Sequence, residues 1–207
     1  MKIRSIAILC IFVLPACKET DNKATALTGE YFTSEKIGWT IKLPGGNWNV
    51  ITKEEREDRN QKTKKEIENA TGINIEMPKI EQLISFKKSN GNSFGSTIEP
   101  FDESKSGEYD QSLALQRQIL KQTYAAKKVH AVFEIGASRI GGIMLDWTKV
   151  IALKRDNPDQ RKDVTIYIYN CLRNNYILTM ALAYDNAVDE EILMNTVRSS
   201  KFTEVNK

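Results

Sequence analysis

The sequence predicts an α+β domain built on an antiparallel β-sheet of about six strands. Two kinds of observation lead to this fold class. Segments with alternating apolar and polar residues recur along the chain, and several are joined by turns too short for a helical crossover. Other segments repeat apolar residues at the spacing of an α-helix, which is typical of helices that cover one face of a sheet. The chain has 207 residues, 41% of them hydrophobic, which is enough for one domain with its own core.

Several segments have the alternation and turn boundaries of β-strands. These segments are Trp39 to Leu43, residues 48–51, Gln82 to Lys88, Ser93 to Glu99, Val129 to Ile135, Ile143 to Leu153, Val164 to Cys171 and Ile177 to Tyr184. Asn90-Gly91 predicts a tight hairpin turn between the third and fourth segments. Gly136 to Gly142 is expected to bend or break the strand that precedes it. The last three segments are joined by short turns and are predicted to form an antiparallel meander.

Three further segments are predicted as helices. They are Lys53 to Ala70, Asp110 to Lys127 and Ala187 to Ser199. The first is densely charged, so it is either a solvated helix or partly a mobile excursion. The second carries Leu113, Leu120 and Tyr124 on one apolar stripe. Asn186 is the predicted N-cap of the third helix. The stripe that we expect this last helix to bury consists of Val188, Ile192, Leu193 and Val197.

The first sixteen residues have the layout of a secretory signal. Basic residues precede an apolar run from Ile6 to Leu14, and Pro15 and Ala16 separate this run from Cys17. The run is shorter than the roughly 20 apolar residues that cross a bilayer as a helix, so a cleaved signal fits it better than a membrane span. A buried N-terminal strand or helix is the alternative interpretation.

The residues LPAC, which end at Cys17, resemble the lipobox of bacterial lipoproteins. The resemblance implies that residues 1–16 are a signal peptide removed before Cys17, and that Cys17 then carries acyl chains such as palmitate. Each buried methylene of such a chain contributes about 0.8 kcal/mol, so several chains anchor a protein firmly to a membrane. We expect residues 17–30, which are mostly polar, to form the lipidated cysteine and a flexible tether.

The residues after Cys17 bear on where the expected lipoprotein is retained. No aspartate follows Cys17 at the position that keeps many lipoproteins in the inner membrane, so we expect the outer membrane rather than the inner one. The run from Lys18 to Asp21 partly resembles the export signal of surface lipoproteins. The sequence therefore leaves open whether the domain, residues 31–207, faces the periplasm or the cell surface.

Charge and cysteine content exclude several classes of function. Removal of the signal takes away Lys2 and Arg4, so 28 of the 30 basic residues remain against 27 acidic ones. This near balance gives no reason to expect a nucleic-acid partner. Once Cys17 is lipidated and the signal is removed, Cys171 is the remaining cysteine of the three. An internal disulfide is then excluded, and we expect Cys171 to be a small buried hydrophobic residue.

Three stretches resemble the PsbP-like fold and, within it, small lipoproteins of the DcrB type. They read IGWTIKLPGGNW, FEIGASRIGGIMLDW and YILTMALAYDNAVDEEILMNTVRSSKF, at residues 37–48, 133–147 and 176–202. The resemblance implies an antiparallel sheet sandwiched by helices. It also implies an accessory or assembly factor attached to a larger machine, because most members act in that way. None of the three stretches is a catalytic motif, and no shared active site is implied.

The sequence shows no catalytic constellation. His130 is the one histidine and lies within a predicted strand, and no Gly-x-Ser-x-Gly motif is present. Histidine and cysteine are too few for a metal site built on them, and the acidic clusters at Asp102-Glu103 and residues 189–191 lack the alternating oxygen ligands of a calcium loop. The aromatic residues of the strands, such as Trp147 and Tyr167, fit a core better than a stacking platform. We therefore expect neither an enzyme nor a bound cofactor or metal.

The function expected from the sequence is a membrane-anchored, non-catalytic envelope lipoprotein that binds a protein partner. The alternative is a lipoprotein that binds a small ligand such as a sugar, or a hydrolase with a non-classical carboxylate site. A candidate partner-binding feature is the turn KRDNPDQRK, because a charged hairpin tip can attract an acidic surface or lipid headgroups. A turn that is merely solvated is the competing interpretation. The basic residues of this turn are Lys154, Arg155, Arg161 and Lys162.

Overall fold

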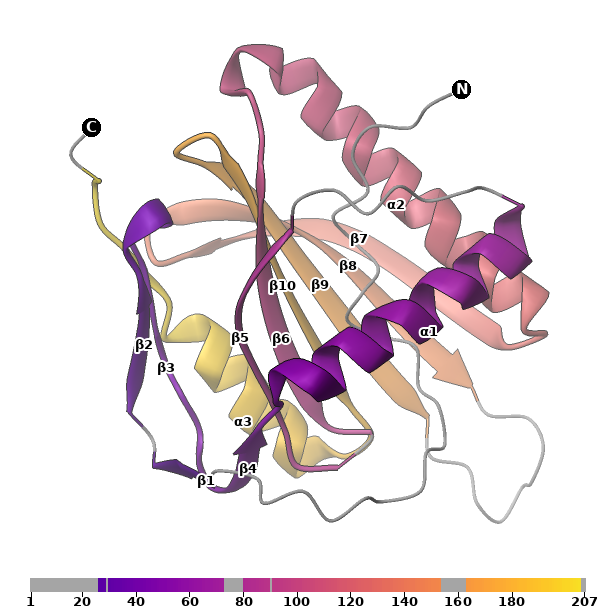
Figure 1. Cartoon of the computed structure of the whole chain (residues 1–207), viewed down its shortest axis with the longest axis horizontal. Coiled ribbons are helices and arrows are strands. Elements are labelled where there is room, and N and C mark those ends of the chain that lie inside the picture. Colours follow the sequence, from indigo (N-terminus) through magenta and orange to yellow (C-terminus); the bar gives the residue numbers. More distant parts are fainter. Residues whose placement is uncertain (1–25, 29, 73–79, 90, 154–162, 206–207) are drawn as a thin grey trace.

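The computed structural model describes residues 26–28, 30–72, 80–89, 91–153 and 163–205. Within these residues the fold is α+β, with an antiparallel main sheet, helices on both of its faces and a smaller sheet beside it (Figure 1). The main sheet has eight strands in the order β1-β4-β5-β6-β10-β9-β8-β7. The predicted fold class is therefore confirmed, whereas the predicted number of about six strands is too low.

The described strands form two sheets, and three α-helices and two short 3-10 turns complete the described part of the chain. The main sheet consists of β1 (Ala26–Thr28), β4 (Gly45–Val50), β5 (Glu81–Lys87), β6 (Ser93–Pro100), β7 (His130–Ile140), β8 (Ile143–Leu153), β9 (Val164–Arg173) and β10 (Tyr176–Tyr184). The smaller sheet consists of β2 (Tyr31–Ser34), β3 (Trp39–Lys42) and β11 (Lys201–Phe202). The helices are α1 (Lys53–Thr71), α2 (Ser106–Ala126) and α3 (Ala187–Arg198), with short 3-10 turns η1 (Glu35–Ile37) and η2 (Glu103–Lys105).

Both faces of the main sheet are covered, because adjacent residues of its central strands belong to different hydrophobic clusters. Leu182 of β10 lies in a cluster that includes Leu193 of α3. Its neighbour Ala181 lies in a second cluster, with Ile67 of α1 and Ile119 of α2. Since successive side chains of a strand point to opposite faces, α3 covers one face and α1 and α2 cover the other.

The smaller sheet joins the two ends of the described chain. Trp39 of β3 is fully buried, and its indole Nε1 donates a hydrogen bond to Oγ of Ser200 at 3.0 Å. β11 pairs with β3 on one side, and β2 pairs with β3 on the other. Neither β2 nor β11 was predicted, because each is short and depends on a partner strand far away or across a turn.

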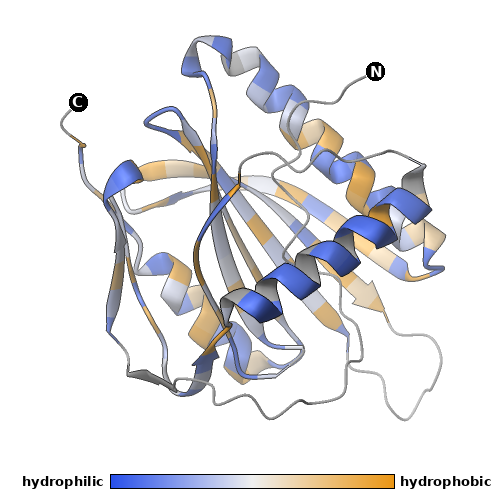
Figure 2. Cartoon of the chain, in the orientation of Figure 1, coloured by the Kyte–Doolittle hydropathy of each residue, from blue (hydrophilic) through white to orange (hydrophobic). Residues whose placement is uncertain are grey.

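α1 is an ordered helix although Figure 2 shows it hydrophilic over most of its length. Thr52 and Glu55 form a capping box at its start: the N–H of Glu55 donates to Oγ1 of Thr52 at 3.3 Å, and the N–H of Thr52 donates to Oε2 of Glu55 at 3.2 Å. Gly72 ends the helix in the left-handed conformation. Ile67 is 1% exposed and attaches the helix to the core. Of the two interpretations of this charged segment, the helix is correct.

β7 and β8 form one long hairpin. β7 runs through Gly136 without a break, so the bend expected from Gly136 onward is wrong for that residue. Gly136 is paired with Trp147, and a Cβ at this position would overlap the indole ring, which explains a glycine inside a regular strand. The chain reverses at Gly141 and Gly142, which have φ angles of 57° and 86° and thus the left-handed backbone of a tight turn.

Two other expectations need correction. The expected tether reaches residue 30, but β1 already pairs with β4 in the main sheet, with Ala26 opposite Asn49. Val188 was expected in the buried stripe of the last helix, yet its side chain is 66% exposed. Leu193 and Val197 are buried as expected and Ile192 packs partly against the core, whereas Asp189 rather than Val188 is the buried residue in the first turn of α3.

Candidate functional site

Two sequence predictions fall on residues outside the described ranges. Cys17 precedes the first described residue. The strands on either side of the predicted turn, β8 and β9, are antiparallel neighbours as predicted, and Ala152 is paired with Val164 near their ends. The residues between these strands that were proposed to bind a partner, and that are not described, are Lys154, Arg155, Arg161 and Lys162.

Cys171 and His130, which could supply nucleophilic or acid–base chemistry, lie in different surroundings. Cys171 is a buried free thiol, as predicted. Burial raises the pKa of this thiol to about 12, so it stays protonated and unreactive at neutral pH. His130 is exposed at the start of β7. Within the described ranges, no three His, Cys, Asp or Glu side chains are placed to hold a metal ion, and no helix is long and apolar enough to cross a membrane.

The aromatic residues of the central strands lie mostly inside the domain. The ring of Tyr167 lies 5.8 Å from that of Trp147 and is stacked 5.7 Å from that of Tyr169, which is 3% exposed. Phe133 lies on the opposite face of the sheet and contacts Tyr124 of α2 edge-on, at 6.0 Å. These rings stabilise the core and are not a continuous stacking surface, in agreement with the preferred interpretation of the sequence.

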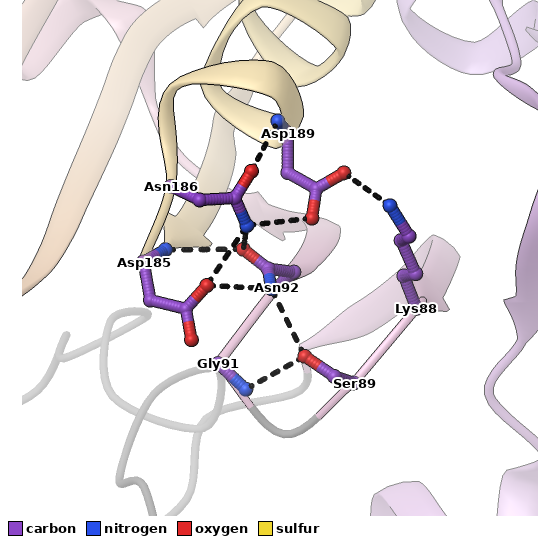
Figure 3. Close-up of polar contacts among 7 residues, drawn as sticks. All are labelled: Lys88, Ser89, Gly91, Asn92, Asp185, Asn186 and Asp189. Carbon is purple, nitrogen blue, oxygen red and sulfur yellow. Dashed lines mark hydrogen bonds and ion pairs between the residues drawn. The ribbon is translucent and has the colours of Figure 1, made fainter. Parts of the chain in front are cut away.

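A polar cluster joins the β5–β6 turn to the start of α3 (Figure 3). Nδ2 of Asn92 donates to Oδ1 of Asp185 at 2.9 Å, and the N–H of Asp185 donates to Oδ1 of Asn92 at 3.0 Å. Asn186 is the N-cap, as predicted, and accepts from the N–H of Asp189 at 2.9 Å. Lys88 donates to the buried carboxylate of Asp189 at 2.8 Å. Because these groups satisfy one another, the cluster fixes two elements together and is not a free binding site.

A row of polar side chains crosses the main sheet beneath α2. Thr97, Thr179, Asn170 and Asp146 belong to β6, β10, β9 and β8, and each lies directly opposite the next. Oγ1 of Thr179 donates to Oδ1 of Asn170 at 2.8 Å, and Nδ2 of Asn170 donates to Oε1 of Gln116 of α2 at 3.2 Å. This row gives the helix a fixed position on the sheet through directional contacts.

Three buried atoms at or near this row have no hydrogen-bond partner among the described residues. They are Oγ1 of Thr97, Nε2 of Gln116 and Oε2 of Glu99. Glu99 is 4% exposed, and burial raises the pKa of its carboxyl to about 7. A buried polar atom without a partner destabilises the folded state by about 1–3 kcal/mol, so contacts elsewhere in the fold must offset the burial of these atoms.

An open depression of about 580 Å³ lies where β6 ends and β9 turns into β10. One wall is Pro100 to Asp102, and the other is Asn174 to Tyr176. The N–H of Phe101 donates to the carbonyl of Asn175 at 2.8 Å, which holds the two walls together. Asn174 and Asn175 have φ angles of 51° and 60°, as a tight turn requires. Nδ2 of Asn174 is buried and has no partner among the described residues.

The outer edge of β7 is the second candidate surface. β7 is an eleven-residue strand at the end of the main sheet, and no described strand pairs with its outer side. Val132 and Ile135 of β7 are 44% and 60% exposed, and Met144 of the adjacent strand β8 is 51% exposed. Because successive side chains of a strand alternate between faces, Ile135 and Met144 lie on one face of the hairpin and Val132 lies on the other, so both faces beside the free edge carry exposed apolar side chains.

The comparisons with known proteins bear on the fold. No family model and no curated protein match the sequence. The solution structure of the cyanobacterial PsbP protein CyanoP from Synechocystis sp. PCC 6803 is similar, with a TM-score of 0.50 and 10% sequence identity. The match covers 92% of this chain and 99% of that chain. The domain has a PsbP-like fold. At this level of identity the similarity concerns the arrangement of the elements, and it transfers no binding or catalytic residue.

Sequence reasoning missed both candidate surfaces of this PsbP-like domain. Asn174 and Asn175 lie in the short turn predicted between the last two strands, and Pro100 follows a predicted strand, so neither feature by itself indicates a binding site. The strand end at Glu99-Pro100 and the Asn-Asn turn are both visible in the sequence. The order of residues along the chain does not show that β6 and β10 are neighbours, so it does not bring these two features together. The free edge of β7 also has no local signal, because which strand lies at the edge depends on the order of the whole sheet.

Proposed function

We propose that this chain is a lipid-anchored, non-catalytic binding module of the cell envelope, of the DcrB type, which takes up an extended segment of a partner protein at the edge of β7. The free edge of this strand is the observation that carries the proposal. An edge strand presents a row of N–H and C=O groups, and another extended backbone satisfies such a row most completely. The lipobox-like LPAC at Cys17 supports the anchor.

The edge of β7 lacks the usual protection against pairing. Natural edge strands are often short or carry charges that project outward, whereas β7 has eleven residues. Its Glu134 lies 3.5 Å from Lys149 of β8, and Nη1 of Arg139 donates to the carbonyl of Gly142 at 3.1 Å. Both charges are thus engaged within the hairpin. Ile135 lies on the same face as Phe133, beyond the contact of that ring with α2, and is free to contact an apolar side chain of the partner.

A non-catalytic role is supported by the positions of the reactive groups. The thiol of Cys171 is buried, and the carboxylates of Asp189 and Asp146 accept hydrogen bonds from Lys88 and Tyr109. Each of these groups has a structural contact that explains its presence. A binding module needs a rigid scaffold and an accessible surface, and the hairpin of β7 and β8 offers both.

The experiment places a photoactivated cross-linking residue at Met144 of the full-length protein in its own cells. We expect one discrete cross-linked product, and we expect Val132→Lys with Ile135→Lys to reduce it at least about fivefold, since two buried apolar contacts are lost. The matched control is Val188→Lys, the same change at an exposed valine of α3, which should leave the product unchanged. A cross-linked product with twice the mass of the chain would mean that the partner is a second copy of this protein. Equal yields from both variants would contradict the edge as the binding surface.

The anchor is tested separately. Cys17→Ser should move the protein from the membrane fraction to the soluble fraction and should abolish labelling by radioactive palmitate, because the thiol is the acceptor of the acyl chain. A matched control is Cys171→Ser, which removes the buried thiol and leaves Cys17 in place. If Cys17→Ser remains in membranes after a high-salt wash, the lipoprotein proposal is wrong, whatever the result of the cross-linking.

A further inference from the structure

We propose that the depression between the end of β6 and the β9–β10 turn binds a small, neutral, polyhydroxylated ligand of the carbohydrate class. Its lining consists of Pro100, Phe101, Asp102, Asn174, Asn175 and Tyr176. This site lies apart from the edge of β7, and its assignment does not depend on the proposed protein partner. The volume of about 580 Å³ falls within the range of small-ligand sites.

The lining combines apolar faces with both kinds of hydrogen-bonding group. Phe101 and Tyr176 supply aromatic surface, which can stack on the C–H face of a ring. Asn174 and Asn175 carry amides that donate and accept, and Asp102 carries a carboxylate that accepts. A sugar hydroxyl also donates and accepts, so the side chains match a ligand with several hydroxyl groups arranged around an apolar ring face.

The amide of Asn174 is the strongest indication of a ligand. The left-handed backbone of the turn explains why asparagine is tolerated at this position, but it does not explain a buried amide nitrogen without a partner. Such a donor is normally satisfied by water or by a bound molecule. The nitrogen is closed off from solvent, so the amide must rotate toward the depression before a hydroxyl or ring oxygen of a ligand there can accept from it and recover the cost of its burial.

The charges around the depression favour a neutral ligand. Hydrogen bonds from the hydroxyl and the N–H of Ser104 hold the pKa of Asp102 below its ordinary value, so this carboxylate stays ionised and disfavours an anion. Lys105 lies near enough to lower the pKa of Asp102 further, so its charge offsets that of the carboxylate. This offset weakens the attraction for an ammonium ligand, which the aromatic rings and the carboxylate would otherwise suit.

The walls of the depression are held in place before any ligand binds. Besides the bond from Phe101 to Asn175, the N–H of Asn175 donates to Oε1 of Glu103 at 2.8 Å. Phe101 also contacts Tyr109 of α2 edge-on, with ring centroids 6.3 Å apart. A preformed site loses little entropy on binding, which allows a small contact area to give measurable affinity.

The test uses the full-length protein labelled with fluorotyrosine, in a polyoxyethylene detergent that carries neither sugar nor ammonium groups. Maltose, chitobiose and choline are titrated, and the fluorine resonance of Tyr176 is followed after assignment with Tyr176→Phe. We expect this resonance to shift with at least one of the two sugars and not with choline. The resonance of Tyr31, which is 61% exposed on β2, is the internal control and should not move.

Variants of Asn174 decide whether the site is the one proposed. Asn174→Asp removes the donor and keeps the shape, and Asn174→Gly keeps the left-handed turn without a side chain. Each should raise the sugar concentration at half-shift about fivefold, as the loss of one hydrogen bond implies. Asn69→Asp, the same chemical change at an exposed position of α1, should leave it unchanged. No shift with either sugar, an equal shift with choline, or an unchanged midpoint in both Asn174 variants would overturn the assignment.

Discussion

Glu99→Gln should make the domain more stable relative to wild type at alkaline pH than at acid pH. The carboxyl of Glu99 is 4% exposed, its Oε2 has no hydrogen-bond partner among the described residues, and burial raises its pKa from 4.5 to about 7. Between pH 4.5 and about pH 7 the folded protein therefore holds a proton that the unfolded chain has already lost. Stability linked to this group is fully present below pH 4.5, falls between pH 4.5 and 7, and is lost above about pH 7.

The size of the effect follows from the difference between the two pKa values. One pKa unit corresponds to about 1.4 kcal/mol, so charging a carboxyl moved from 4.5 to about 7 costs at most about 3 kcal/mol. We expect about 2 kcal/mol, because water that reaches the group when the domain fluctuates lowers the cost. Glutamine is neutral at every pH and nearly the same size. It adds a buried donor whose cost does not change with pH. The difference in unfolding free energy between variant and wild type therefore changes with pH only through the charge of Glu99.

The assay is urea unfolding of wild type and Glu99→Gln at about pH 4.5 and about pH 8. The variant should gain about 2 kcal/mol relative to wild type between the two conditions. Glu204→Gln, the same change at an exposed carboxyl near the C-terminus, should change by less than about 0.5 kcal/mol. If the difference between Glu99→Gln and wild type is the same at both pH values, Glu99 is not a buried, unpaired carboxyl and the description of the region beneath α2 is wrong.

Two further substitutions test the packing of the sheet. Gly136→Ala should destabilise the domain by about 1–3 kcal/mol in thermal unfolding, because the added Cβ overlaps Trp147; Gly107→Ala, where a Cβ meets no atom within 4 Å in the first turn of α2, should be neutral or slightly stabilising. Leu120→Ala should cost about 2–5 kcal/mol in urea unfolding, since the side chain is 7% exposed. Val188→Ala, at a 66% exposed position, should lie within about 0.5 kcal/mol of wild type; similar costs for both truncations would contradict the burial assigned to α2 and α3.

Local signals in the sequence determined most of the elements. Alternation located the long strands, apolar spacing located α2, and Asn186 with the acidic residues after it located the start of α3. These features depend on interactions within a few residues, which the order of the chain displays directly. For α1, which has little apolar surface, the sequence predicted a helix but left open a partly mobile segment, and the structure shows the helix.

Features that depend on distant residues were decided only by the tertiary structure. β11 exists because β3 lies beside it, and Gly136 stays within a strand because Trp147 needs the space across the hairpin. The candidate site appears only where β6 meets the β9–β10 turn, and the raised pKa of Glu99 exists only because α2 and the sheet exclude water from it. The sequence by itself thus determined which residues form strands and helices. The packing of these elements decided which side chains are neighbours, because contacts between remote segments form only when the whole sheet is assembled.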